Sequence, residues 1–357
     1  MITLPTRYSK MVMTLSGGGM GETALCFDSN LQRQVVVKSL KPGIEKYRLM
    51  DELSALADIR SKYVVQVLDV IHDDLEIVGF VEEYIEGTDL KPIEASSGTG
   101  VALRSLYSII SGISDVHQHG RVHRDIKPDN MKVDSSGVLK IFDFGLAKLS
   151  DGAKTKQLFF TPFYAAPEVF IPDSSGNHIF TAAVDIFAFG VTALWLLNAG
   201  KLPPELGHVP PSIPKKSLAF NSTDVSVPVE IAYLLNSTLS YDPLERPNAE
   251  TLRAALGKNL LFDKHRMLIT YSGSDHFVDA ANRTVTLTAQ GDGVTISYDG
   301  LDFVVTQVLG HVRHNNRQVV VGYRLQGAAV IVLGDPSGDR RLRTSITADI
   351  SHPEVMN

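Results

Sequence analysis

The first part of the chain follows a pattern of apolar and polar positions that predicts strands, one helix and then further strands. Residues 8–40 contain apolar runs on either side of a glycine cluster, and the β-branched run at 35–37 favours a strand. Residues 44–60 place apolar side chains at helical spacing, which predicts an amphipathic helix. β-type runs follow at 64–71 and 76–85. We therefore expect a sheet with one helix in this part.

The middle of the chain has mostly helical periodicity. Residues 101–118 follow a helical pattern, and Gly120 suits the end of that helix. Beyond Pro167 the pattern stays mostly helical, with a loop at 201–228 that is rich in Pro and Ser. The longest apolar stretch, 182–200, is interrupted by Asp185 and Asn198, which favours a buried helix over a membrane span.

The pattern changes near residue 259 to strict alternation typical of strands. Residues 284–288 and 294–298 alternate on either side of a turn at 290–293, which predicts a hairpin. Further β-rich stretches lie at 303–312, 318–324 and 328–333. We interpret this region as a separate all-β domain of roughly 90 residues.

Composition agrees with a two-domain globular protein. The chain has 357 residues, which is longer than a single hydrophobic core usually supports, so two domains are expected. Its content of 44% apolar and 21% charged residues is ordinary for a globular protein. The net charge of −6 argues against non-specific binding to nucleic acid and against a polybasic membrane surface. Residues 259–357 carry 9 basic and 10 acidic side chains, and this near-neutral charge argues against nucleic acid as a ligand of the β-rich region as well.

The cysteine content and the amino-terminal sequence indicate a cytoplasmic protein. Cys26 is the only cysteine, so an internal disulfide is excluded and a reducing compartment is expected. Its position near the glycine cluster is that of a strand residue, and no neighbouring group that lowers a thiol pKa is recognisable. The first eight residues lack the pattern of a basic region followed by an apolar one that marks a secretion signal.

Two strings of residues carry the strongest chemical signal. Residues 123–130 read His-Arg-Asp-Ile-Lys-Pro-Asp-Asn, and 143–145 read Asp-Phe-Gly. They place an acceptor carboxylate, a cation and two side chains of the metal-ligand type on adjacent loops. This combination suits the transfer of a phosphoryl group from a nucleotide to a hydroxyl group.

A glycine cluster and a lysine supply a second part of the same chemistry. Glycines at 17–21 let the backbone approach phosphates closely, although such a cluster alone is more often an ordinary turn. Lys38 ends the following strand, where its ammonium group could reach phosphates. Glu52 falls on the helix register that faces Lys38, whereas Asp51 points about 100° away.

These residues occur in the order found in the Hanks-type (eukaryotic-like) protein kinases, and the chain resembles their bacterial serine/threonine members over about residues 8–258. The resemblance also covers Glu83-Tyr84-Ile85 as the hinge and Ala166-Pro167-Glu168 as the end of the activation segment. Asp185 matches the aspartate that supports the catalytic loop, and Arg246 matches the arginine that pairs with Glu168.

The resemblance implies an α+β fold, namely a bilobal protein kinase fold followed by a small all-β domain. Residues 1–258 would form the kinase domain, with the small lobe at about 1–85 and the large lobe at about 86–258, and residues 259–357 the β-rich domain. ATP and Mg²⁺ are the implied cofactors. Nucleotide-binding positions would be Leu15, Ser16, Gly17, Gly18, Gly19, Met20, Gly21, Thr23, Lys38, Glu52, Glu83 and Ile85.

The resemblance also assigns the transfer step. Asp125 would accept the proton of the attacking hydroxyl, and Lys127 would steady the transferred phosphate. Asn130 and Asp143 would bind Mg²⁺, which prefers oxygen ligands. Lys127 is typical of serine/threonine kinases, so a protein serine or threonine hydroxyl is the expected acceptor.

Three positions depart from the family pattern around the nucleotide. Ser16 stands at the first loop glycine, and Thr23 at a valine that packs on adenine. Glu82 falls at the back wall of the pocket, where a carboxylate must be paired or protonated. Three interpretations of Glu82 stay open: it competes with Glu52 for Lys38, it joins the Lys38–Glu52 pair, or the alignment is off by one residue.

Other features leave alternatives open. His117, His119 and His123 suggest a metal site, but packing of His123 against the catalytic loop is the better interpretation. In the family, an arginine at the position of Arg124 often binds a phosphate on the activation segment, here between Asp143 and Glu168. Thr155 is the favoured site of that phosphate, and Ser150 is the second choice. The alternative is that the segment is ordered without phosphorylation.

The function has alternatives too. The kinase part could be a partner-binding pseudokinase or a regulatory module for the β-rich domain. That domain could recruit substrate, bind a regulator, buttress the small lobe or form a homodimer.

Overall fold

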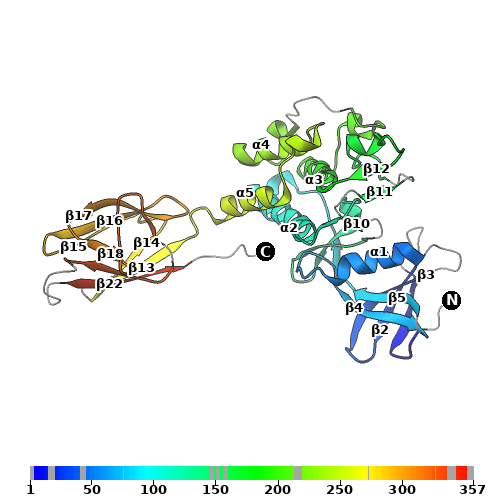
Figure 1. The fold of residues 1–357 in the computed structure, drawn as a ribbon, viewed down its shortest axis with the longest axis horizontal. Coiled ribbons are helices and arrows are strands. Elements are labelled where there is room, and N and C mark those ends of the chain that lie inside the picture. The colour runs from blue at the N-terminus through cyan, green and yellow to red at the C-terminus, as the bar shows by residue number, and fades with distance from the viewer. Residues whose placement is uncertain are drawn as a thin grey trace. The chain divides into compact units, whose positions relative to one another are not determined.

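The computed structural model describes residues 4–14, 21–40, 46–74, 76–144, 148–149, 153–155, 160–212, 219–271, 273–325, 327–335 and 343–351. The chain divides into two compact units, residues 1–256 and residues 257–356. Figure 1 shows that the first unit contains both a sheet and a group of helices, whereas the second is built of strands.

The first unit begins with an antiparallel five-stranded sheet and one helix, which together form the small lobe. The β-branched run at 35–37 lies in the middle strand, where Val35 and Val37 are buried in one core with Cys26 and Val81. Side chains alternate along a strand, so Lys38 lies on the opposite face, toward the helix. The strand order is β1-β2-β3-β5-β4. The elements are β1 Tyr8–Thr14, β2 Gly21–Asp28, β3 Arg33–Leu40, α1 Lys46–Ala57, β4 Val67–Asp73 and β5 Glu76–Glu83.

The remainder of the first unit, the large lobe, is mainly helical. Its strands pair in short groups, β6-β8-β9, β7 with β10, and β11 with β12. The helices are α2 Thr99–Gln118, α3 Ala182–Leu197, α4 Val229–Thr238 and α5 Ala249–Leu261. The strands are β6 Gly87–Asp89, β7 Arg121–Val122, β8 Met131–Asp134, β9 Leu139–Ile141, β10 Lys148–Leu149, β11 Ala153–Thr155 and β12 His178–Phe180. Single 3₁₀ turns lie at 95–97, 128–130, 167–170, 204–207, 219–222 and 243–245.

Helix α3 is the central helix of the large lobe, as the apolar stretch at 182–200 predicted. It is buried along almost its whole length. At Gly190 an added Cβ would come 2.1 Å from the Thr238 hydroxyl, so a side chain there would push α3 away from α4. None of the described helices has the length and apolar content that crossing a membrane requires.

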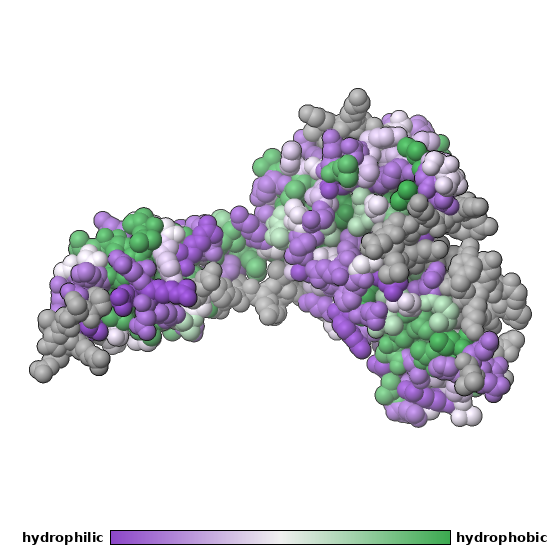
Figure 2. Space-filling model, in the orientation of Figure 1, coloured by the Kyte–Doolittle hydropathy of each residue, from purple (hydrophilic) through white to green (hydrophobic). Residues whose placement is uncertain are grey.

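The surface of the first unit differs between its lobes. Figure 2 shows that the visible face of the helical lobe is largely hydrophilic, while apolar surface gathers over the five-stranded sheet. Near the end of α1, a cavity of about 450 Å³ is lined by Leu53, Leu56 and Ile59 together with residues of β4.

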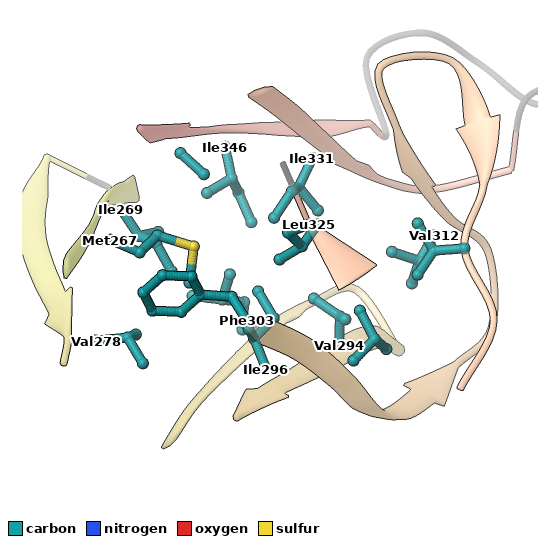
Figure 3. Close-up of a cluster of buried hydrophobic side chains, with 14 of the residues drawn as sticks. Met267, Ile269, Val278, Val294, Ile296, Phe303, Val312, Leu325, Ile331 and Ile346 are labelled. Atoms are coloured by element: carbon teal, nitrogen blue, oxygen red, sulfur yellow. The ribbon is translucent and has the colours of Figure 1, made fainter. Parts of the chain in front are cut away.

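The second unit is a sandwich of two antiparallel sheets. Figure 3 shows Met267, Ile331 and Ile346 from one sheet directed toward Ile296 and Phe303 from the other, and all are buried in one core. The strand orders are β14-β13-β22-β21-β18-β19 and β15-β16-β17-β20. The strands are β13 Arg266–Tyr271, β14 Ser274–Val278, β15 Thr284–Ala289, β16 Asp292–Tyr298, β17 Phe303–Leu309, β18 Val312–His314, β19 Arg317–Gln318, β20 Arg324–Leu325, β21 Ala329–Leu333 and β22 Thr344–Ser351.

The predicted hairpin of the second unit is confirmed. Strands β15 and β16 pair in register from Thr284 opposite Ser297 to Ala289 opposite Asp292. The turn residues Gln290 and Gly291 both have positive φ, as a tight hairpin of this hand requires. The expected strand at 318–324 is wrong, because the chain between β19 and β20 forms a loop that exposes Val320 and Val321.

Arg246 joins three parts of the large lobe. Its guanidinium donates to both carboxylate oxygens of Glu168, at 2.7 and 2.8 Å, which confirms the predicted pair. It also donates to the carbonyl oxygens of Ala183, at the start of α3, and of Ser240, after α4. The Arg246 side chain is fully buried, so this planar donor is satisfied entirely by protein groups.

We predict that Arg246→Met lowers the free energy of unfolding of the first unit by about 3 kcal/mol, because Glu168 loses its partner in a largely buried site. The control Arg253→Met removes a pair whose arginine is 30% exposed and is expected to cost less than about 1 kcal/mol. Urea unfolding followed by fluorescence of Trp195, the only tryptophan, measures both losses. Equal losses would contradict the prediction.

Candidate active site

The loop at 123–130 is held by a buried carboxylate of α3. Asp185 accepts hydrogen bonds from the backbone N–H groups of His123 and Arg124, both at 2.8 Å, and pairs with His117 at 2.9 Å. Burial raises the pKa of Asp185, but its interactions with His117, His123 and Arg124 outweigh burial and hold that pKa below its usual value. Arg124 has a φ of 72°, in the left-handed region, and its bond to Asp185 stabilises that conformation.

Asp125 is the centre of a hydrogen-bond network on this loop. Its Oδ1 accepts from the Thr161 hydroxyl at 2.7 Å, and its Oδ2 accepts from Lys127 Nζ at 2.7 Å and Asn130 Nδ2 at 2.9 Å. Lys127 also donates to Thr161 at 3.0 Å. Burial raises the pKa of Asp125, but the hydrogen bonds from Lys127 and Thr161 outweigh it and lower that pKa. Asp125 is therefore a fixed, ionised acceptor that can orient a hydroxyl group.

Asn130 and Asp143 lie on neighbouring backbone segments. Met131 pairs with Ile141 between β8 and β9, and the Phe142 N–H donates to the Asn130 carbonyl at 3.0 Å. The Asn130 amide nitrogen donates to Asp125, which leaves its side-chain oxygen for a ligand. Asp143 is exposed and has a φ of 64°.

The donor set fits Mg²⁺. One carboxylate and one amide are hard oxygen donors, and Mg²⁺ usually completes its shell with waters and phosphates. The described residues contain no group of three or more His, Cys, Asp or Glu side chains placed to hold a metal. An ion at Asn130 and Asp143 would therefore require oxygens from outside the protein.

Lys38 lies between two carboxylates of the small lobe. Its Nζ is 2.6 Å from Glu52 Oε1, on α1, and 3.2 Å from Glu82 Oε1, on β5. Glu52, and not Asp51, therefore forms this ion pair. Burial lowers the pKa of Lys38, but the charges of Glu82, Glu52 and Asp143 outweigh burial and hold that pKa above its usual value. The Lys38 ammonium is permanently charged at neutral pH.

Glu82 shares Lys38 with Glu52 in the same structure. Its side chain is 6% exposed, and its Oε2 is buried without a hydrogen-bond partner among the described residues. Burial raises the pKa of Glu82 to about 7, against the opposing effect of Lys38. Of the three interpretations of Glu82, the geometry favours the one in which it joins the Lys38–Glu52 pair.

The hinge begins at Glu83, the last residue of β5, and continues beyond that strand. The Glu83 carboxylate accepts from Lys140 Nζ at 2.8 Å and from the Gln66 N–H at 3.0 Å, and the Glu83 N–H donates to the Gln66 carbonyl. Ile85 is buried. These contacts fix the hinge against β9 and the segment before β4.

Across β2 and β3, Thr23 is opposite Lys38, and Gly21 is opposite Leu40. The predicted nucleotide-loop residues Leu15, Ser16, Gly17, Gly18, Gly19 and Met20 lie outside the described residues, as does Ser150.

The three histidines near the catalytic loop at 123–130 have separate structural roles. His119 Nδ1 bonds to the carbonyl of Asp115, whereas His117 bonds to Asp185. The His123 ring contacts the Phe142 carbonyl at 3.3 Å and packs against Phe144 with 4.4 Å between ring centroids. The interpretation of His123 as a packed residue of the loop is confirmed.

Sequence reasoning missed the environment of Arg124. Its guanidinium carbon lies 3.5 Å from the centroid of the Phe180 ring, and its Nε is buried without a hydrogen-bond partner among the described residues. Burial lowers the pKa of Arg124 to about 10. Strand β12, which carries Phe180, pairs with β11, and the register places Thr155 opposite His178. Nothing in the sequence indicated that Phe180 packs on Arg124, because the strand of Phe180 pairs with a strand more than twenty residues earlier and its position depends on that pairing.

The lobes and these contacts define a phosphoryl-transfer enzyme. A lysine of the five-stranded sheet pairs with a glutamate of α1, and a hydrogen-bonded aspartate lies on a loop of the helical lobe. Residues 10–255 match the family model described as the protein kinase domain. The chain belongs to this family, and the predictions of a protein kinase enzyme and of its fold are confirmed. A protein kinase domain implies ATP as phosphoryl donor, typically with Mg²⁺, and a protein as acceptor.

Similar proteins are protein kinases, and two of the three described below are named as serine/threonine kinases. The probable serine/threonine-protein kinase pknA2 of Bifidobacterium longum is 28% identical over 295 residues, covering 76% of this chain and 38% of the relative. The serine/threonine-protein kinase PrkC of Bacillus subtilis is 29% identical over 280 residues, covering 73% and 41%. The sucrose non-fermenting protein kinase 1 of Fusarium virguliforme is 30% identical over 254 residues, covering 69% and 35%. The matched part of this chain therefore spans about two fifths of each relative.

Proposed function

We propose that this chain transfers the γ-phosphoryl group of ATP to serine or threonine hydroxyls of proteins. The observation that carries the proposal is the hydrogen-bond network in which Asp125 accepts from Lys127, Thr161 and Asn130. This network fixes both oxygens of the Asp125 carboxylate beside the Lys127 ammonium group. A carboxylate fixed in this way can position an acceptor hydroxyl. The Ser/Thr kinase names of the relatives support the same acceptor class.

In this proposal Asp125 orients the acceptor hydroxyl and takes its proton as the new phosphate ester forms. A carboxylate with a lowered pKa is a weak base, so its main contribution is orientation. This suits a loose transition state, in which the proton leaves late. Lys127, held by Asp125 and Thr161, would place positive charge beside the transferred group.

Two further residues would hold Mg²⁺, and the small lobe would hold the nucleotide. Asn130 and Asp143 would bind the ion through oxygen, and a bound Mg²⁺ would neutralise charge on the phosphates. Lys38, fixed by Glu52, would contact the phosphates, and the backbone at Glu83 and Ile85 would bind adenine. The anchoring of Glu83 by Gln66 and Lys140 supports a rigid adenine site.

We also propose that the protein works in a reducing cytoplasm. The only cysteine, Cys26, is fully buried in the core of the small lobe, where it packs as a small apolar residue. With one cysteine, this sequence can form no internal disulfide, as is usual for proteins of a reducing compartment. Fractionation of the native cells followed by immunodetection of the full chain tests this localisation.

We predict that Lys38→Met and Asp125→Asn each reduce phosphate transfer from radiolabelled ATP by at least about a hundredfold. The first removes the cation at the phosphates, and the second removes the proton acceptor. The control Lys62→Met changes an exposed lysine and should leave transfer unchanged. Transfer that survives both substitutions would contradict the proposal, and absence of transfer in wild type would favour a pseudokinase.

We predict that Thr161→Val shifts the acid limb of the kcat profile to higher pH. Asp125 must be ionised to act, and its pKa rises when it loses the hydroxyl donor, so activity is lost earlier as the pH falls. Thr161→Ser keeps the hydroxyl and should restore the wild-type profile. An acid limb that stays in place in the valine variant would contradict this role of Thr161.

We predict that phosphate on Thr155 raises activity several-fold, because it adds charge to a strand that pairs next to Phe180 and Arg124. Turnover of dephosphorylated and phosphorylated wild type is compared with that of Thr155→Ala. The matched control is Ser150→Ala, on the same segment. Equal turnover of Thr155→Ala and fully phosphorylated wild type would show that the segment is ordered unaided, since Arg124 already stacks on Phe180.

A further inference from the structure

The Lys38 site contains one more carboxylate than an ion pair needs. Lys38 Nζ contacts Glu52 Oε1 at 2.6 Å and Glu82 Oε1 at 3.2 Å, and both glutamates are buried. Glu52 lies on α1 and Glu82 on β5, so the lysine of β3 is held from two different elements. Two anchors fix the ammonium more firmly than one, but the second adds an uncompensated negative charge.

The charged groups around Glu82 can be named element by element within the described residues. Lys38 faces it from β3, Glu52 from α1, and Asp143 acts on it from the segment after β9. From β4 its cross-strand neighbour is Val67, which is apolar. One cation therefore balances three carboxylates. Under the proposed function, nucleotide phosphates must approach this cation, and each brings further negative charge.

The two oxygens of Glu82 have different surroundings. Oε1 contacts Lys38, whereas Oε2 is buried with no hydrogen-bond partner among the described residues. A buried, unpartnered oxygen of a carboxylate is costly while the group is ionised. The cost increases when phosphates draw Lys38 away, because Oε1 then loses its donor too. A proton on the carboxylate removes that cost.

We propose that Glu82 is a positioning residue that holds Lys38 while the nucleotide site is empty and takes up one proton from solvent when nucleotide phosphates take over Lys38. The carboxylate becomes a neutral carboxylic acid, Lys38 stays an ammonium ion, and the buffer supplies the proton. Glu52 keeps its contact with Lys38 throughout. This inference rests on the proposed function, because it requires phosphates at Lys38.

The pKa of Glu82 agrees with this exchange. Burial raises it to about 7 in the nucleotide-free site, where Lys38 opposes the rise. When Lys38 turns to the phosphates, Glu82 loses the cation that opposes the effect of burial, and its pKa rises further. Above about pH 7 the empty site is therefore ionised and the filled site protonated, so nucleotide binding consumes a proton and weakens as the pH rises.

Binding of Mg²⁺ and a non-hydrolysable ATP analogue to the full chain, measured by titration calorimetry, tests the proposal. From about pH 7 to about pH 8.5, wild-type affinity is expected to fall by on the order of tenfold. Heats measured in two buffers of different ionisation enthalpy should give an uptake approaching one proton at the higher pH. Glu82→Gln keeps the shape and the contact with Lys38 but removes the charge, and should bind with neither pH dependence nor proton uptake.

Three further variants separate the possible failures. Glu76→Gln, at the exposed end of the same strand, should behave as wild type. Glu82→Met serves as a second test if the glutamine variant unfolds, and should also lose the proton uptake. Equal proton uptake in wild type and both Glu82 variants would overturn the proposal while leaving the kinase function intact. Lys38→Met that binds nucleotide as tightly as wild type would show that phosphates do not take over Lys38, and would overturn the proposal. Wild type that binds no nucleotide would instead overturn the proposed function.

Discussion

The carboxylate of Asp185 accepts hydrogen bonds from two successive backbone N–H groups, of His123 and Arg124, inside a helix that is otherwise almost wholly apolar. A charge in such a place is stable because each of the two carboxylate oxygens accepts a hydrogen bond from the loop. In return the loop has one conformation, with Arg124 at a positive φ. The position of Asp125, and with it the whole hydrogen-bond network, follows from this contact.

Two acidic residues of the site have opposite electrostatic environments. Asp125 receives three side-chain donors, and its pKa is lowered. Glu82 receives one, its second oxygen has no partner in the part of the chain that the structure describes, and its pKa is raised. The residue types are nearly the same chemically, so donors and burial decide which carboxylate is ionised. The large lobe therefore supplies a permanently charged acceptor, while the small lobe has a carboxylate whose charge responds to its surroundings.

Local patterns predicted the parts of the fold that local interactions determine. The hairpin of β15 and β16 was predictable because the alternating residues and the turn residues are adjacent in the chain. Helical spacing likewise predicted that Glu52 faces Lys38. The prediction missed β13, β14 and β22. Strand β13 pairs with β22 some eighty residues later, and no local pattern specifies such a partner. Stacking of Phe180 on Arg124 was missed for the same reason, since tertiary packing alone brings them together.

The pairing of β11 with β12 links the strand at 153–155 to the catalytic loop through a series of contacts. Strand β12 ends at Phe180, whose ring lies against Arg124, and the backbone of Arg124 bonds to Asp185. A displacement of β11 would therefore be transmitted to the residues that hold the catalytic loop. The conformation of residues 153–155 and the alignment of Asp125 are thus energetically linked.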